Sequence, residues 1–161
     1  MVIVIMGTTG AGKTTIGTLL AKRLGWQFAD GDDFHPAANV EKMRQGVPLT
    51  DADRAPWLQA LQDKIIEWLG AAQNVVLACS ALKEAYRREL LVGPDVKLVY
   101  LKGTAELFSR RVSGRKGHFA KQDLIASQFA TLEEPSGALT VDTAKLPDAI
   151  VAEICRRLAL H

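Results

Sequence analysis

The chain has little cysteine, almost no charge excess and no long hydrophobic run, and each scarcity excludes a class of protein. Its two cysteines, Cys79 and Cys155, lie in apolar runs without histidines at metal-ligand spacing, so neither a disulfide scaffold nor a cysteine metal site is expected. A net charge of +2 gives no general attraction to nucleic acid or to a membrane surface. Because no run approaches the length of a membrane span, we expect a cytoplasmic protein in a reducing compartment.

The composition that is present is typical of one globular domain. Hydrophobic residues make up 48% of the 161 positions and charged residues 24%, which excludes a disordered tail. The apolar start, residues 1–6, lacks a basic leader and runs directly into glycines, so it predicts a buried strand rather than a signal peptide. Without repeats or a linker, the whole chain, residues 1–161, is interpreted as a single domain.

Strand-like apolar runs alternate with amphipathic stretches along the chain. The expected strands are residues 2–6, 26–30, 75–79, 97–102 and 138–142. The expected helices are residues 13–24, 36–45, 51–70, 81–91, 104–112, 123–133 and 147–159, with Asp51 or Asp53 as the N-cap of the long third helix. This alternation predicts an α/β three-layer sandwich with a parallel sheet of five strands and two loop-rich excursions, near residues 31–53 and 113–121.

A glycine-rich motif directly follows the first expected strand and matches G-x-x-x-x-G-K-[ST] at every fixed position, as a P-loop requires. Its backbone amides and the start of the next helix would surround phosphate oxygens. Lys13 would reach the β- and γ-phosphates, and the Thr14 hydroxyl would bind Mg²⁺. The motif therefore predicts nucleotide binding by Gly7, Thr8, Thr9, Gly10, Ala11, Gly12, Lys13, Thr14 and Thr15.

The carboxylates that would accompany the P-loop follow the second expected strand. The third strand ends in Ala78-Cys79-Ser80 without an acid, and no guanine-reading Asn-Lys-x-Asp segment is present, which argues against a motor ATPase and a regulatory GTPase. Asp30 and Asp32 stand where a parallel strand ends at a ligand crevice. One carboxylate could position hydrated Mg²⁺ while the other accepts a proton from an attacking hydroxyl. Turn and capping chemistry would also suit Asp30-Gly31-Asp32.

Beyond the P-loop, a series of uncommon runs resembles the gluconokinase family along almost the whole chain. The runs are residues 30–36 (DGDDFHP), 39–43 (NVEKM), 46–51 (GVPLTD), 53–58 (DRAPWL), 79–83 (CSALK), 86–87 (YR), 100–103 (YLKG), 115–119 (RKGHF), 128–129 (QF), 131–133 (TLE) and Pro135. Residues 59–74 and 138–161 match in little beyond their hydrophobic pattern. The order of the runs is what makes the resemblance specific.

The resemblance implies an enzyme that uses ATP and Mg²⁺ to phosphorylate D-gluconate to 6-phospho-D-gluconate. It also implies the fold of the adenylate and shikimate kinases, with a lid at about residues 113–121, and a homodimer. Three alternatives stay open: the same chemistry on shikimate or another aldonate, a regulatory or nucleic-acid-associated nucleotide-binding module, and a nucleoside monophosphate kinase. AMP-dependent or RNA-stimulated turnover would favour the last two.

Acceptor residues follow from the chemistry of a sugar acid, which needs a cation and hydrogen-bonding groups. Asp32 resembles the substrate-contacting acid of this kinase group and is the expected base at the 6-hydroxyl. His35 could contact the sugar acid or merely hold its loop. The expected cations are Arg54 and, one turn apart on a predicted helix, Lys83 and Arg87. Ser80, at a strand end, is a further candidate contact.

A basic stretch separates the fifth and sixth expected helices. A nucleic-acid patch would need interleaved aromatics, and only Phe119 lies nearby, so a lid over ATP explains the charges better than a nucleic-acid partner does. Aligned on the family pattern, Arg111 would pack over the adenine and Arg115 would neutralise charge on the transferring phosphoryl group. A solvated helix end is the alternative for Arg115.

Two tryptophans have helical spacing toward the core. Trp57 and Trp68 are therefore expected to serve in packing rather than as ligand platforms. The loop after Asp142 is expected to border the adenine, although no side chain in it stands out.

Overall fold

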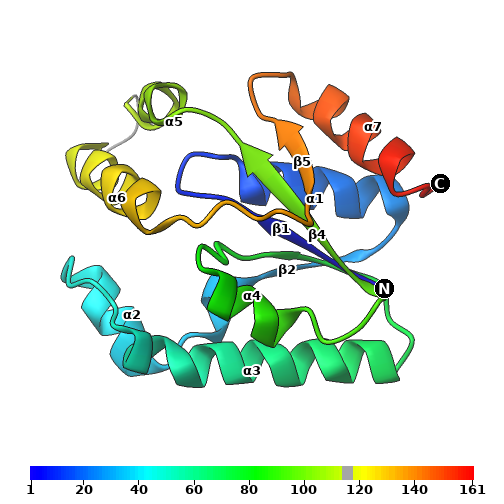
Figure 1. The fold of residues 1–161 in the computed structure, drawn as a ribbon, viewed down its shortest axis with the longest axis horizontal. Helices are drawn as coiled ribbons and strands as arrows, with labels where there is room; N and C mark the ends of the chain where they lie inside the picture. Colours follow the sequence, from blue (N-terminus) through cyan, green and yellow to red (C-terminus); the bar gives the residue numbers. More distant parts are fainter. Residues whose placement is uncertain (114–117) are drawn as a thin grey trace.

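The computed structural model describes the backbone of residues 1–113 and 118–161 and the side chains of residues 1–113 and 123–161. Its centre is a five-stranded parallel sheet (Figure 1). The strands are β1 (Val2–Met6), β2 (Gln27–Asp30), β3 (Val75–Ala78), β4 (Val96–Lys102) and β5 (Leu139–Asp142). Their order, β2-β3-β1-β4-β5, places β1 in the middle, in register with β3 on one side and with β4 on the other.

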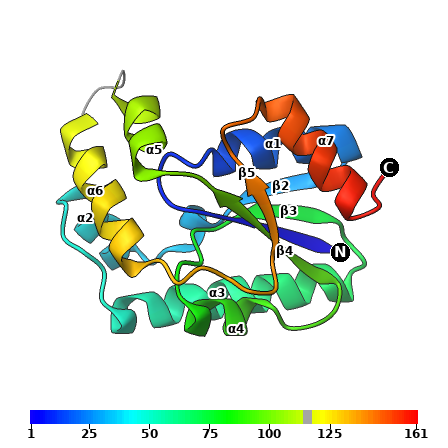
Figure 2. The same ribbon diagram turned by 45° about the horizontal axis from the view of Figure 1, so that its top comes forward.

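Helices cover both faces of the sheet, which makes the three-layer arrangement visible in Figure 1. On one side lie α1 (Lys13–Leu24) and α7 (Pro147–Arg157), and on the other lie α3 (Asp51–Gly70) and α4 (Glu84–Leu90). The remaining helices are α5 (Ala105–Val112), α6 (His118–Thr131), α2 (Ala37–Arg44) and the short 3-10 helix η1 (Gly31–Phe34). Figure 2 shows α2, α5 and α6 together at one end of the molecule.

The core consists of two layers because successive side chains of a strand point to opposite faces of the sheet. In β1, Ile3 and Ile5 pack into the cluster beneath α1 and α7, whereas Val2, Val4 and Met6 pack toward α3 and α4. All five side chains are fully buried, as expected for a central parallel strand.

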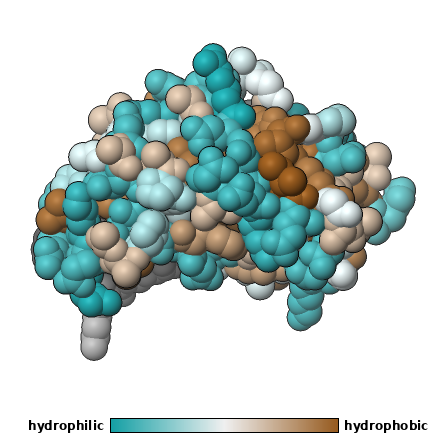
Figure 3. Space-filling view, turned by 90° about the horizontal axis from the view of Figure 1, so that it is seen from below, coloured by the Kyte–Doolittle hydropathy of each residue, from teal (hydrophilic) through white to brown (hydrophobic). Residues whose placement is uncertain are grey.

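The outer surface over α3 is mostly hydrophilic, with one concentrated hydrophobic area (Figure 3). Among the residues that the structure describes, no helix is both long enough and apolar enough to cross a membrane.

The predicted fold class and the five strands are confirmed, and the largest errors concern helix starts. Helix α3 is capped by Thr50, so the prediction of Asp51 or Asp53 as N-cap is wrong. Thr50 Oγ1 accepts a hydrogen bond from the Asp53 amide (3.1 Å), and Asp53 Oδ2 accepts one from the Thr50 amide (2.9 Å). This reciprocal capping box satisfies two amides that a helix end leaves free. Helix α4 begins at Glu84 rather than at residue 81, because Ala81 has a left-handed backbone (φ 46°) and Lys83 is extended.

Candidate active site

A cavity of about 1270 Å³ opens at the carboxyl ends of the strands, where ligands bind in open parallel sheets. Its walls come from elements far apart in the chain: the P-loop, η1, the loop after α2, α6 and the loop after β5. Of the predicted site residues, those that line it are Thr9, Gly10, Ala11, Gly12, Lys13, Thr14, Thr15, Asp30, Asp32, His35, Arg54, Ser80 and Arg111.

The P-loop has the backbone that its glycines permit. Gly10 and Gly12 have φ angles of 88° and 93°, a region that side chains rarely adopt. A Cβ at Gly10 would also lie 2.8 Å from the Cβ of Phe108 on α5. Gly12 is the N-cap of α1 and has no side-chain cap, so the first amides of the helix face the cavity without a protein side chain to accept from them.

Two observations fit this loop to the phosphates of a nucleotide. The Thr8 hydroxyl is buried and is the only buried side-chain polar atom without a partner among the residues described. Lys13 curls over the loop, with its Nζ 3.2 Å from the Thr8 carbonyl oxygen. Burial lowers the pKa of Lys13, while the Asp32 carboxylate opposes the shift. A half-buried ammonium beside free helix amides is a site for a strongly anionic ligand.

The two predicted carboxylates share one turn at the end of β2. Asp30 Oδ1 accepts a hydrogen bond from the Asp32 amide (3.0 Å) and so caps η1, yet both residues also line the cavity. Capping and ligand binding are therefore compatible at Asp30. Enclosure by the cavity walls raises the pKa of Asp32, the neighbouring Asp30 adds to the rise, and Lys13 opposes it. A carboxylate whose pKa is raised is a stronger base than an ordinary aspartate.

No group of three or more His, Cys, Asp or Glu side chains able to hold a metal ion occurs among the described residues. Mg²⁺ does not need one, because it commonly keeps several waters and takes one or two protein oxygens together with substrate phosphates. Thr14 and Asp30, which both line the cavity together with Lys13, fit that pattern. Cys79 also lines the cavity, but burial raises the pKa of its thiol to about 12, which keeps it protonated.

His35 continues the wall beyond the two aspartates. Its ring stacks on the indole of Trp57, with centroids 4.4 Å apart and planes at 13°. The buried Asn39 side chain contacts His35 Nδ1 (3.2 Å) and donates to the Asp53 carbonyl oxygen (2.8 Å). Burial, and to a lesser degree Arg54, lowers the pKa of His35, so the imidazole is neutral at pH 7.

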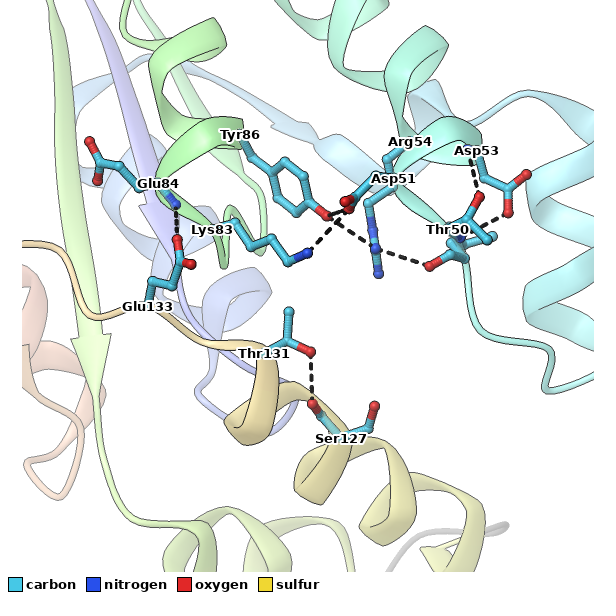
Figure 4. Close-up of polar contacts among 11 residues, drawn as sticks. Thr50, Asp51, Asp53, Arg54, Lys83, Glu84, Tyr86, Ser127, Thr131 and Glu133 are labelled. Carbon is cyan, nitrogen blue, oxygen red and sulfur yellow. Dashed lines mark hydrogen bonds and ion pairs between the residues drawn. The ribbon is translucent and has the colours of Figure 1, made fainter.

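A polar cluster joins α3 to α4 beside this wall (Figure 4). Arg54 donates to the Leu49 carbonyl (3.0 Å) and to the Tyr86 hydroxyl (3.2 Å). Tyr86 donates to Asp51 Oδ1 (2.5 Å), and Lys83 Nζ lies 3.3 Å from the same oxygen. The hydrogen bonds from Tyr86 and Lys83 lower the pKa of Asp51. Arg54 is the member of the cluster that reaches the cavity.

Lys83 and Arg87 do not line this cavity. Helical spacing predicted one shared face, but Lys83 is the extended N-cap residue outside α4, so the spacing does not apply. Arg87 is buried, with an exposed fraction of 2%, and donates to the carbonyl oxygens of Ala81 (2.7 Å) and Glu133 (2.8 Å). Its contacts are therefore those of a structural residue. Gly7 and Thr8 of the P-loop are also not among the residues that line the cavity.

Helix α6 supplies residues that the sequence reasoning missed. Gln128 Oε1 accepts a hydrogen bond from the Thr9 amide of the P-loop (2.6 Å), and Ser127 and Thr131 line the cavity beside it. The run Gln128-Phe129 belonged to the family resemblance, which was the available signal, but a contact across 119 residues has no local pattern.

The segment that leaves α6 is fastened to the start of α4 by Glu133. Its amide donates to the Leu82 carbonyl (2.8 Å), and its carboxylate accepts from the Glu84 amide (2.7 Å), the first residue of α4. An acidic group at a helix start is favourable for the helix dipole. Figure 4 shows Glu133 facing the α4 start from across the turn.

The predicted nucleotide-side arginines have different outcomes. Arg111 donates to the carbonyls of Gly10 (3.4 Å) and Thr143, and its guanidinium lies 5.8 Å from the Phe108 ring centroid. It thus joins the P-loop to the loop after β5, which lines the cavity. That this loop borders the adenine stays a prediction. Arg115 lies outside the described residues. Of the predicted lid, residues 113–121, the backbone of residues 118–121 is described and forms the start of α6, which begins at His118 rather than at residue 123.

A P-loop after the central strand of a parallel sheet, two carboxylates at the end of β2 and the Arg54 guanidinium, which all line one cavity, define a P-loop kinase that phosphorylates a small molecule. Comparison with known proteins agrees. The shikimate kinase family model matches residues 9–159. A probable gluconokinase of Xenopus tropicalis is 47% identical over 96% of this chain and 91% of its own. The thermoresistant gluconokinase of Escherichia coli is 40% identical, over 94% of this chain and 89% of its own.

Solved structures agree with the sequence relatives. A gluconokinase from Sinorhizobium meliloti 1021 superposes with a TM-score of 0.87 at 39% identity, covering 98% of this chain and 90% of that one. The APS kinase CysC of Mycobacterium tuberculosis, with a TM-score of 0.72 and 19% identity over 98% of this chain and 96% of that one, shares the fold. The chain belongs to the gluconokinase family of P-loop kinases.

Proposed function

We propose that this protein is a gluconokinase, which transfers the γ-phosphoryl group of ATP to D-gluconate and releases 6-phospho-D-gluconate and ADP. The observation that carries the proposal is one cavity that the P-loop, the Asp30–Asp32 turn, His35 and Arg54 line together. Relatives named gluconokinase, at 40–47% identity over most of the chain, support the choice of acceptor.

The nucleotide side uses the P-loop and its surroundings. The free amides at the start of α1 and the Lys13 ammonium bind the phosphates, and Thr14 and Asp30 hold the metal. Mg²⁺, when bound, neutralises charge on the phosphate oxygens. Arg111 lies at the adenine end beside the loop after β5. Arg115 neutralises charge on the transferring group, a role proposed from its family position alone.

The acceptor side must bind a carboxylate and orient one hydroxyl. A guanidinium can grip a carboxylate with two hydrogen bonds, so Arg54 binds the C1 carboxylate. The neutral His35 and Ser80 contact hydroxyls. Lys83, which pairs with Asp51 and lies over the Tyr86 ring, adds positive charge beside the Arg54 cluster. Asp32 accepts the proton of the 6-hydroxyl, because its raised pKa makes it a better base than an ordinary aspartate.

Three further features belong to the proposal. Residues 113–121 form a lid over the nucleotide, residues 31–53 form the acceptor-binding excursion, and the enzyme acts as a single-domain protomer of a homodimer. A cytoplasmic location accords with the two free cysteines, Cys79 and Cys155, both of which are buried.

The test is ADP release with Mg·ATP and one of five additions: D-gluconate, another aldonate, shikimate, AMP or no acceptor. We expect turnover that depends on D-gluconate, with 6-phospho-D-gluconate as the product. Lys13→Ala is the matched control and should abolish transfer, because the phosphates lose their central cation. If only shikimate supported turnover, the assignment of D-gluconate as the acceptor would be wrong. An equal rate of ADP release with every addition and with no acceptor would refute the kinase function.

A further inference from the structure

Trp57 has a polar contact that its place in the core does not require. The side chain is buried, with an exposed fraction of 3%, and packs with Leu61 and Ile65 in the cluster beneath the sheet. Its indole Nε1–H nevertheless donates a buried hydrogen bond of 2.8 Å to the carbonyl oxygen of Gly31. That carbonyl belongs to the residue between Asp30 and Asp32.

The Gly31 backbone has little room to move away from this contact. A Cβ at Gly31 would lie 2.8 Å from the Ala78 carbonyl oxygen and 3.3 Å from Cys79 Cβ, so the turn already touches the end of β3. Trp57 holds the turn through the hydrogen bond to the Gly31 carbonyl oxygen. The end of β3 packs against the Gly31 Cα and limits movement of the turn in that direction. The direction of the Asp32 carboxylate follows from how this turn is held.

The same indole also orients His35. The two rings are nearly parallel, and both residues line the cavity. Trp57 is itself placed by α3, whose start is fixed by the Thr50–Asp53 capping box and whose Asp53 carbonyl accepts from Asn39. One rigid helix therefore supports two groups on the acceptor side through one side chain.

We infer that Trp57 is a positioning residue for phosphoryl transfer: its indole N–H fixes the Asp30-Gly31-Asp32 turn, and its ring face fixes the His35 imidazole. This inference rests on the proposed function, since it assigns Asp32 the role of base. A displacement of a fraction of an ångström at the base is enough to matter, because catalytic geometry tolerates little error.

The experiment compares Trp57→Phe with Trp68→Phe. Trp68 is a buried residue of the same helix and packs edge-on against Phe34 of η1 at 6.4 Å, but it makes no hydrogen bond to the turn. Turnover is normalised to the number of sites that bind an ATP analogue, so that unfolded protein does not count. For Trp57→Phe we expect kcat to fall about tenfold while the KM for ATP stays within about twofold. Trp68→Phe should lose a similar amount of thermal stability and keep its normalised kcat.

A normalised kcat of Trp57→Phe equal to the wild-type value would overturn the inference, as would an equal loss in both variants. If Trp57→Phe does not fold, Trp57 is replaced by benzothienylalanine, which keeps the ring volume and removes only the N–H. A lowered normalised kcat of that variant would support the inference, and a wild-type value would overturn it. Failure of the proposed function looks different, because the wild-type protein itself would then show no gluconate-dependent turnover. The same comparison is then made with the acceptor that supports turnover.

Discussion

Arg87→Met tests whether the buried arginine of α4 stabilises the fold or binds the acceptor. Sequence spacing predicted an acceptor contact, whereas the guanidinium donates to Ala81 and Glu133 and pairs with Glu84 Oε2 at 3.2 Å. Methionine keeps much of the side-chain volume but has no donor. The substitution therefore leaves two backbone carbonyls without their partners.

The magnitude follows from these contacts. A buried acceptor that loses its donor costs roughly 1–3 kcal/mol. Ala81 is buried and Glu133 is exposed, so water can replace part of the second contact and the sum is about 2–4 kcal/mol. For a chain of 161 residues this corresponds to a Tm lowered by about 5–15 °C. Because Arg87 does not line the cavity, the KM for D-gluconate should stay within about twofold, as expected of a residue that makes no contact with substrate.

The assay combines urea denaturation with initial rates measured well below the Tm of the variant. Arg88→Met is the matched control, since the side chain of Arg88 is 77% exposed and lies 3.7 Å from Glu84, and it should change the free energy of unfolding by less than about 0.5 kcal/mol. The reasoning is refuted if Arg87→Met keeps wild-type stability while the KM for D-gluconate rises tenfold or more.

Three further substitutions separate the other roles. Asp32→Asn should lower kcat by about a hundredfold or more and remove the acidic limb of the pH–rate profile. It should also raise the Tm at pH 7, because a raised folded pKa means that this carboxyl loses its stabilising contribution as the pH rises through that pKa; a lowered Tm would contradict this. Gly10→Ala should weaken binding of ATP and destabilise the fold more than Gly25→Ala, which has the same backbone strain (φ 69°) but open space around it; equal losses would show that the contact with Phe108 is unimportant. Arg54→Ala should raise the KM for D-gluconate by about 10–100-fold with a smaller change in kcat, Arg54→Lys should recover part of it, and an unchanged KM would remove Arg54 from the acceptor site.

Those parts of the structure whose physical cause is local could be predicted from the sequence. A central parallel strand is apolar on both faces, so β1 and β3 are continuous hydrophobic runs with recognisable ends. The P-loop needs its glycines and lysine at fixed spacing. The register of β2 on β3 and of β3 on β1 brings Asp30 to the same edge of the sheet as the P-loop. Local pattern therefore sufficed to predict the P-loop and the carboxylates at the same edge of the sheet, but not the contact of Gln128 with the loop.

The acceptor side depends on contacts between distant elements, and there the sequence misled. The helix was predicted to begin at Ala81, but Ala81 and Leu82 precede it. The Arg87 guanidinium donates to the Ala81 carbonyl and the Glu133 amide donates to the Leu82 carbonyl, and these contacts hold both residues outside the helix. The hydrophobicity of Trp57 predicted burial correctly, yet its hydrogen bond spans 26 residues and leaves no trace in periodicity. A buried polar contact is set by tertiary packing, which a single sequence does not display.

The strand order has a consequence for how the protein comes to be folded. β1 is made first, and its five side chains end fully buried, but its neighbours are β3 and β4, whose residues follow some seventy and ninety positions later. The β2 strand, next in synthesis, pairs with β3 and not with β1. The sheet therefore cannot start to assemble on the ribosome until β3 has emerged, and until then an apolar strand is exposed to other nascent chains. The central position of β1 thus delays the burial of its side chains until strands far along the chain have been made.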